Sequence, residues 1–262
     1  MPILLSLPLL KISQDEFHEI DRRVLGHAFA IHNQFGRLLD EVIYKNELAE
    51  RCGKDGLTVQ REVMIRVCFG DFSKVYFADL LICDRVVVEA KTVRALTDVH
   101  RGQGLNYLLL TGTHHGSLIN FRTSRVQREF LSTWLTLEMR QQFEISRIQW
   151  PEDEAHSRLL EQVISFCGDV GLGLDLQLYR DAFPLLIGRP NKQLVPILSG
   201  SKIIGHQEMS MLKDDIAMVV TSLQEVSGYR RHLERLLSTT LLMGLAWVNV
   251  KLGVIEFENL KR

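Results

Sequence analysis

The sequence predicts an α/β fold in which a sheet flanked by helices is followed by a second, degenerate copy of a similar unit. Two observations lead to this prediction. Helical and strand-like patterns follow one another in the first half of the chain, and several stretches of that half recur in order in the second half. The composition, 46% hydrophobic and 24% charged, is that of a globular protein. A length of 262 residues allows one large domain or two small ones.

The opening stretch, MPILLSLPLL, is apolar, and we expect it to form a leading strand or an extended arm. It has no basic residue before it and no small-residue cleavage site, so it does not have the pattern of a targeting segment. No stretch of the chain reaches the roughly 18 uninterrupted apolar residues of a transmembrane helix. The sequence therefore predicts a soluble, cytoplasmic protein that does not bind a membrane.

Two helices are expected next. Ser13 and Glu16 have the spacing of a capping box, which marks the start of a helix. We expect this helix to run to Gly36. A second helical stretch, LLDEVIYKNELAERCG, ends at Gly53, and glycine is the residue type that favours the end of a helix.

Strands dominate the following segment. Alternating and β-branched patterns predict three of them, TVQREVMIRVCF, KVYFADLLI and RVVVEAKTV. Thr97 can cap a further helix, DVHRGQGLNYLLLT, and GSLINF is then a short buried strand. The pattern breaks at Trp150-Pro151, beside an acidic run, which indicates a boundary. The predicted domains are residues 1–148 and 149–262.

The second half repeats features of the first. One offset relates Gly36 to Gly171 and Tyr44 to Tyr179, within GRLLDEVIY and GLGLDLQLY. Two looser matches follow in the same order: SKVYFADLLICDRVVVEAKTV resembles SKIIGHQEMSMLKDDIAMVVTSL, and LNYLLLTGTHHGSLINF resembles ERLLSTTLLMGLAWVNV. Three matches in one order predict an internal duplication.

Charge and cysteine content narrow the function classes. The formal net charge of −1 provides no global basic field, which counts against tight, non-specific binding of nucleic acid. It does not exclude an enzyme that recruits positive charge as a metal ion. The four cysteines have no C-x-x-C spacing, so they predict reduced thiols and no zinc site.

The segment ADLLICDRVVVEAK places charges in an otherwise apolar hairpin. Strand alternation puts Glu89 and Lys91 on one face, and a turn centred on Asp84 sets Asp79 directly opposite Glu89. Opposed positions have Cβ atoms about 4.5–5.5 Å apart, and two facing carboxylates repel unless a proton or cation lies between them. A hard cation such as Mg²⁺ prefers such oxygens, and Lys91 could orient a water or offset charge on a phosphate. The alternative is an ordinary hairpin with an ion pair at its edge.

The same residues carry a family resemblance. Asp79, a nine-residue spacer and Glu89-Ala90-Lys91 resemble the signature of the PD-(D/E)XK nuclease superfamily. The resemblance implies a restriction-endonuclease-like core, a mixed sheet flanked by helices, with a helical Glu upstream and a helical Gln downstream of the signature. Glu41 is the upstream candidate, three residues before Tyr44, as in the small bacterial GxxExxY proteins. The glycine that this name requires is replaced by Leu38.

The downstream candidate is Gln103, which with Tyr107 is similar to the Q-x-x-x-Y element of RecB-type nucleases; the whole resemblance covers roughly residues 12 to 125. Residues i and i+4 share a helix face, so both side chains can point into one groove. Alternatively, Glu41 is a solvated helix residue, Gln103 bonds locally and Tyr107 packs on the sheet. A set of basic residues could form a phosphate-binding rim or be scattered on the surface. These residues are Arg94, His100, Arg101, Arg122, Arg125 and Arg128.

The resemblance implies a nuclease that uses Mg²⁺ or Mn²⁺ to hydrolyse phosphodiester bonds of DNA or RNA. The expected metal ligands are Glu41, Asp79, Glu89 and the carbonyl of Ala90. The expected catalytic residues are Asp79, Glu89, Lys91 and Gln103, and the expected substrate contacts are Tyr107, Arg94 and Arg101. A catalytically silent module that binds nucleic acid or a protein is the alternative, and a structural subunit is a third.

The second half lacks the proposed site. Against Glu41, Glu89, Lys91 and Gln103 the repeat sets Leu176, Val219, Thr221 and His232, and Asp79 falls near Gln207 or Met209. A core can persist for packing alone, whereas clustered carboxylates need a cation or solvent. The second half is therefore expected to be a non-catalytic partner in an intramolecular pseudo-dimer, or a lobe that positions substrate.

Overall fold

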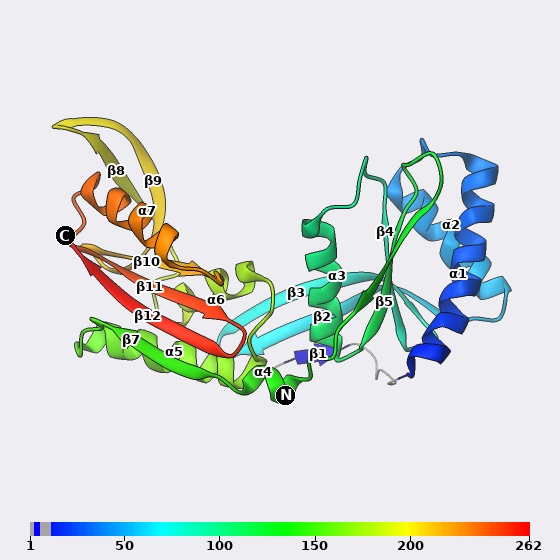
Figure 1. Ribbon diagram of the computed structural model, residues 1–262, viewed down its shortest axis with the longest axis horizontal. Helices are drawn as coiled ribbons and strands as arrows, with labels where there is room; N and C mark the ends of the chain where they lie inside the picture. Colours follow the sequence, from blue (N-terminus) through cyan, green and yellow to red (C-terminus); the bar gives the residue numbers. More distant parts are fainter. Residues whose placement is uncertain (1–2, 6–11) are drawn as a thin grey trace. The chain divides into compact units, whose positions relative to one another are not determined.

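The computed structural model describes residues 3–5 and 12–262, which divide into two compact units (Figure 1). The first unit takes in the described residues up to Cys68 and those from Ser73 to Leu137, and the second comprises residues 69–72 and 138–262. The sequence placed a boundary at residue 148, but β7 (Glu144–Ile148) pairs with a strand of the second unit. Among the described residues, none of the helices is long and apolar enough to cross a membrane.

The first unit contains a six-stranded sheet in the order β1-β2-β3-β4-β5-β6. Its strands are β1 (Ile3–Leu5), β2 (Val59–Phe69), β3 (Phe72–Ile82), β4 (Val86–Lys91), β5 (His115–Asn120) and β6 (Gln127–Ser132). Strands β4 and β5 are parallel, whereas β1 with β2, β3 with β4 and β5 with β6 are antiparallel. The predicted mixed sheet is therefore confirmed.

The helices of the first unit are α1 (Gln14–Phe35), α2 (Glu41–Lys54) and α3 (Asp98–Thr111). The capping box at Ser13 and Glu16 is confirmed, since each residue's side chain accepts the other's backbone N–H. Helix α2 starts at Glu41, later than the sequence pattern suggested. Asp40 has an extended backbone, and the Tyr44 hydroxyl donates to the Gly36 carbonyl at 2.7 Å, which holds the preceding turn outside the helix.

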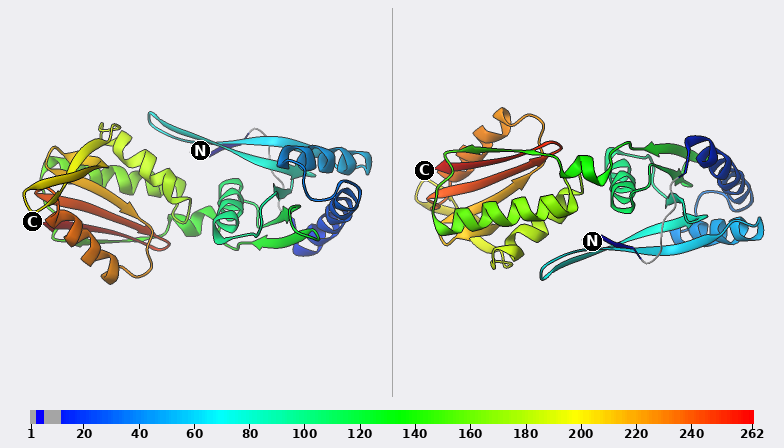
Figure 2. Two further views of the ribbon diagram at one scale, coloured as in Figure 1. Left: turned by 90° about the horizontal axis from the view of Figure 1, so that it is seen from above. Right: turned by 90° about the horizontal axis from the view of Figure 1, so that it is seen from below.

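The two faces of this sheet have different neighbours. Val86, Val88 and Ala90 of β4 lie in one core cluster with apolar residues of α1 and α2. Helix α3 covers the other face, where a Cβ atom on Gly116 would lie only 3.0 Å from Leu108. The two further views of Figure 2 show the first unit's helices on opposite sides of its strands. Glu89 alternates with the core residues of β4 and therefore points toward the α3 side.

Some segments were not expected from the sequence. The polar strand β6 pairs with β5 at the edge of the first sheet, and the short helix α4 (Leu137–Gln141) and β7 follow it. Edge strands need little apolar alternation because one side faces solvent. The predicted leading strand is present as β1, and residues 1–2 and 6–10 of that opening stretch lie outside the described residues.

The second unit contains a six-stranded sheet in the order β7-β12-β11-β10-β9-β8. Its further elements are α5 (Glu154–Val170), α6 (Leu176–Leu186), β8 (Gln193–Ser199), β9 (Lys202–Lys213), β10 (Ile216–Thr221), α7 (Ser227–Ser238), β11 (Gly244–Lys251) and β12 (Val254–Lys261). Strands β8 to β12 occur in the same spatial order as β2 to β6, and β10 and β11 are parallel, as β4 and β5 are. Helix α7 connects this parallel pair, as α3 does in the first unit.

Candidate active site

The hairpin of β3 and β4 has the register that the turn predicts. Leu80 pairs with Val88, Leu81 with Val87 and Ile82 with Val86. Cys83 and Asp84 both have positive φ angles, 54° and 56°, and such left-handed pairs make the tight turns that match the twist of a hairpin. Asp79 and Glu89 follow as the next opposed positions.

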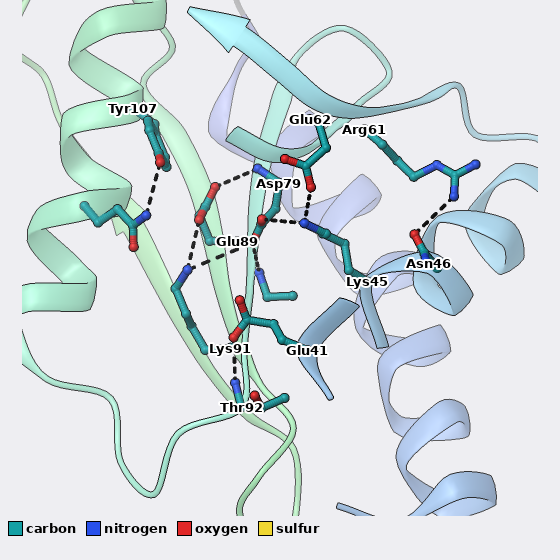
Figure 3. A network of polar contacts seen from close by, with 12 residues as sticks. Glu41, Lys45, Asn46, Arg61, Glu62, Asp79, Glu89, Lys91, Thr92 and Tyr107 are labelled. Carbon is teal, nitrogen blue, oxygen red and sulfur yellow. Dashed lines mark hydrogen bonds and ion pairs between the residues drawn. The ribbon is translucent and has the colours of Figure 1, made fainter. Parts of the chain in front are cut away.

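At these positions the carboxylates take over the hydrogen bonding between the strands (Figure 3). The backbone N–H of Asp79 donates to Glu89 Oε1 at 2.9 Å, and the N–H of Ala90 donates to Asp79 Oδ2 at 3.0 Å. Each acidic side chain is thus held by the backbone of the opposite strand. This reciprocal arrangement places two carboxylates side by side at one point of the sheet.

Two lysines also contact these carboxylates. Lys91 Nζ lies 3.2 Å from Glu89 Oε2 and 4.0 Å from Asp79 Oδ2. Lys45 Nζ, from α2, lies 3.1 Å from Asp79 Oδ1 and also forms an ion pair with Glu62 of β2. Sequence reasoning missed Lys45 and Glu62. Lys45 follows Glu41 by four residues, so a shared helix face was the available signal.

Burial shapes the electrostatics of this cluster. Glu89 is 1% exposed, and its burial, with the neighbouring charge of Asp79, raises the pKa of Glu89 to about 8 against the opposing effect of Lys91. Burial opposes the charge of Lys45, but its hydrogen bonds to Glu62 and Asp79 outweigh that effect and raise the pKa of Lys45. Burial and the neighbouring Asp79 thus disfavour the charged form of Glu89.

Glu41, Gln103 and Tyr107 are the other residues that the sequence predicted for the site. Glu41 stands at the start of α2, and its Oε2 accepts the N–H of Thr92 at 3.0 Å, directly after β4. On α3, Gln103 Nε2 donates to the Tyr107 hydroxyl at 3.1 Å. Burial, and then the charge of Glu89, raises the pKa of Tyr107 to about 12. Figure 3 shows Glu41 and Tyr107 on either side of Asp79, Glu89 and Lys91, each with its own hydrogen bond and no bond to these three residues.

The matched family model is that of the PD-(D/E)XK nuclease superfamily, over residues 18–131. This segment belongs to the PD-(D/E)XK nuclease superfamily. No curated protein and no solved structure matches the chain. The matched segment of the nuclease-superfamily domain contains Glu41, Asp79, Glu89 and Lys91, together with the α3 pair described above. The narrower resemblance to GxxExxY proteins stays a prediction.

The predicted metal ligands of this nuclease-superfamily domain all carry oxygen donors. The carboxylates of Asp79, Glu89 and Glu41 and the carbonyl of Ala90 offer oxygen ligands, which Mg²⁺ and Mn²⁺ prefer. In the described part of the chain, no group of three or more His, Cys, Asp or Glu side chains is assembled to hold a metal ion. Lysine amines contact Asp79 Oδ1 and Glu89 Oε2, so a bound cation would have to displace them.

Some of the basic residues predicted to form a phosphate-binding rim are paired with other groups, and others are exposed. Arg94 is exposed between β4 and α3. Arg101 donates to Glu129 at 2.6 Å and to Asp98 at 2.7 Å, and Arg128 pairs with the buried carboxylate of Asp21. Of the other three, His100 forms a capping box with Thr97, Arg122 donates to the carbonyl of Thr92 and Arg125 is exposed. Ion pairing reduces what Arg101 and Arg128 can offer to a phosphate.

Proposed function

We propose that the first unit is a divalent-metal-dependent nuclease that hydrolyses phosphodiester bonds of DNA or RNA. The observation that carries this proposal is the reciprocal pairing of Asp79 and Glu89 across β3 and β4, with Lys91 beside them, in a domain of the nuclease superfamily. Two acids are brought together at a place where they repel each other without a cation.

Each residue has a distinct role in this proposal. Asp79, Glu89, Glu41 and the carbonyl of Ala90 would hold Mg²⁺ or Mn²⁺, which when bound polarises a phosphate and lowers the pKa of water. Lys91 Nζ donates hydrogen bonds that orient the attacking water or offset charge on the phosphate. Gln103 orients the hydroxyl of Tyr107, and both residues stand on α3.

We also propose that the second unit is a copy of the first, so that the chain is an intramolecular pseudo-dimer. Two sets of hydrogen bonds made by buried tyrosine and asparagine residues support this. Tyr44 bonds to the Gly36 carbonyl and the Leu39 N–H, while Tyr179 bonds to the Gly171 carbonyl and the Leu174 N–H. Asn120 bonds to both backbone groups of Val93, and Asn249 does the same with Leu223.

A comparison with the second unit also supports a functional role for the two acids of the first unit. The ladder between β9 and β10 ends at Met218 and Ser210, the counterparts of Val88 and Leu80. The next opposed positions are Met209 and Val219, where the first unit has Asp79 and Glu89. Two strands can therefore diverge at this point without carboxylates, which makes a purely structural role for the acids less adequate.

A catalytically silent module that binds nucleic acid or a protein is the second candidate. The observation in its favour is that Lys45 and Lys91 already neutralise the two central carboxylates. Internal ammonium groups would then satisfy the acids permanently, and the chain would need no metal.

Metal titration and cleavage separate the two candidates. Under the first, Mg²⁺ or Mn²⁺ raises the melting temperature, because a ligand that binds the folded state stabilises it, and a panel of labelled single- and double-stranded DNA and RNA is cut. Glu89→Ala abolishes both effects, whereas the matched control Glu50→Ala, at an exposed ion pair with Lys54, preserves both. No metal-dependent stabilisation and no cleavage of any substrate in the wild type would favour the silent module. Cleavage that persists in Glu89→Ala would point to another site.

A further inference from the structure

The second unit has a pocket at the place that corresponds to the acidic site of the first. It has a volume of about 440 Å³, which is in the range of small-ligand sites. Residues of α6, β9, β10 and α7 line it, including Met209 and Val219, the counterparts of Asp79 and Glu89. The divergence of two strands thus leaves an open pocket here, without the carboxylates.

Both units have a cation at this position, but only the first unit has carboxylates that neutralise it. Arg180 directly follows Tyr179, as Lys45 directly follows Tyr44, so the equivalent tyrosines make Arg180 the counterpart of Lys45. Lys45 is neutralised by Asp79 and Glu62. Within the described part of the chain, no carboxylate forms an ion pair with Arg180.

The arginine is held in place at the pocket. Its Nε donates to the carbonyl of Val220 at 3.1 Å, which fixes the guanidinium across β10. The two terminal nitrogens of the guanidinium lie in one plane with Nε. Such a planar set of donors can bind two oxygens of a phosphate. Lys192, exposed just before β8, adds a second cation to the lining, against one carboxylate, Glu208.

The rest of the lining is apolar. Met209, Val219 and Leu236 present side chains on which a flat, weakly polar group can pack. A ligand that satisfies both parts carries a phosphate at one end and an aromatic or apolar body at the other. A nucleotide has this composition, either free or within a strand.

We propose that the pocket of the second unit binds a nucleotide, with Arg180 holding its phosphate and the apolar lining covering its base or sugar. The loss of the two carboxylates leaves a basic residue at the pocket, and a basic residue attracts phosphate. The inference does not depend on cleavage by the first unit. It gives the second unit a binding role toward the same chemical class of molecule.

The test is binding to the full chain in EDTA, which prevents any metal-dependent cleavage. The probes are adenosine monophosphate, inorganic phosphate, and fluorescein-labelled DNA and RNA dodecamers. Methionine methyl groups labelled with ¹³C locate the site, because Met209 and Met218 line the pocket and Met64 lies in the first unit. We expect shifts of the Met209 and Met218 signals with adenosine monophosphate or an oligonucleotide, while Met64 is unchanged.

Variants assign the phosphate contact. Arg180→Ala should weaken binding by about tenfold or more, and Arg180→Lys should have a smaller effect, since it keeps the charge and loses the fork. Arg231→Ala removes the same charge from an exposed position of α7 outside the lining and should leave affinity unchanged. If circular dichroism shows that Arg180→Ala does not fold, Lys192→Glu, at an exposed position, tests the basic part of the same pocket lining.

The outcomes are distinct. Binding of oligonucleotides but not adenosine monophosphate identifies a strand as the ligand, and binding of both identifies any nucleotide. Unchanged affinity in a folded Arg180→Ala variant, or shifts confined to Met64, would overturn the proposal. Binding of inorganic phosphate alone, or of no probe, would overturn it as well. Failure of cleavage by the first unit leaves each of these readouts intact, because metal is absent throughout.

Discussion

The ends of two strand ladders, one in each unit, show the same backbone arrangement with different side chains. In the first unit, Asp79 and Glu89 follow the last pair of β3 and β4, and two lysines contact them. In the second unit, Met209 and Val219 take those positions beside an arginine without a carboxylate partner among the described residues. The fold therefore tolerates either charge pattern at this point.

The hydrogen bonds of the buried tyrosine and asparagine residues are the same in both units, whereas the charged residues differ. The tyrosine that closes the turn before α2 or α6 and the asparagine that ends β5 or β11 make equivalent bonds in both units. A buried donor or acceptor left without a partner costs stability, so these residues maintain the fold. Residues that differ between the units at the ladder ends are then the candidates for function.

The largest effect is expected from a change at Lys91, for which Thr221, its counterpart in the second unit, serves as the comparison. Lys91→Ala should lower the rate of metal-dependent cleavage by about 100-fold, which is typical for the loss of one group that stabilises developing charge. It should keep the metal-induced rise in melting temperature, because Lys91 is not a ligand. Thr221→Ala should leave the rate unchanged. Equal losses in both variants would break the functional distinction between the units.

The next effect is on the pH dependence of stability. Because the pKa of Glu89 is raised from 4.5 to about 8, the folded protein binds this proton more tightly than the unfolded chain. The resulting stabilisation is fully present below pH 4.5 and is lost as the pH rises through 8. We expect the free energy of unfolding in EDTA to fall across this window, on the order of a few kcal/mol.

Urea unfolding at several pH values measures this dependence. Glu89→Gln removes the titrating group and should flatten the profile, while Glu50→Gln, at an exposed ion pair with Lys54, should keep the wild-type slope. Parallel profiles for wild type and Glu89→Gln would show that the buried acid does not titrate in this range.

A smaller effect is expected from the two tyrosines. Tyr44→Phe and Tyr179→Phe each leave a carbonyl and a backbone N–H without their hydroxyl partner. Gly171 and Leu174 are buried, so Tyr179→Phe should cost about 1–2 kcal/mol, whereas Tyr44→Phe should cost less because Gly36 is exposed and water can replace the hydroxyl. Urea unfolding with a probe in each unit compares them. Tyr229→Phe is the control, because within the described residues its hydroxyl makes no hydrogen bond. An unchanged free energy of unfolding in Tyr179→Phe would argue against the equivalence of the two units.

The smallest effect concerns competition between lysine and metal. Lys45→Gln removes an ammonium group from Asp79 Oδ1 and should tighten Mg²⁺ binding severalfold, since a like charge near the cation is lost. Calorimetric titration measures the affinity. Lys54→Gln, on the exposed part of the same helix, should leave it unchanged. Weaker binding in Lys45→Gln would mean that Lys45 supports the site instead of competing for it.

Local sequence was sufficient for much of the site. The turn at Cys83 and Asp84 set the register of the hairpin, and alternation along β4 placed Glu89 opposite Asp79 on the α3 face. The capping box at Ser13 and the helix closed by Gly112 were likewise predictable. In each case the determining contacts lie within about ten residues, so short-range geometry decides the outcome.

Long-range packing decided the rest. Lys45 of α2 contacts Asp79 and also pairs with Glu62 of β2, and no local pattern predicts an ion pair between separate elements. Strand β7 joins the second sheet only through pairing with β12. The burial that raises the pKa of Glu89, and the pocket that surrounds Arg180, both arise from helices that pack against the sheets. The sequence by itself determined which acids face each other, whereas the tertiary structure decided which cations meet them, because desolvation and distant neighbours depend on the whole fold.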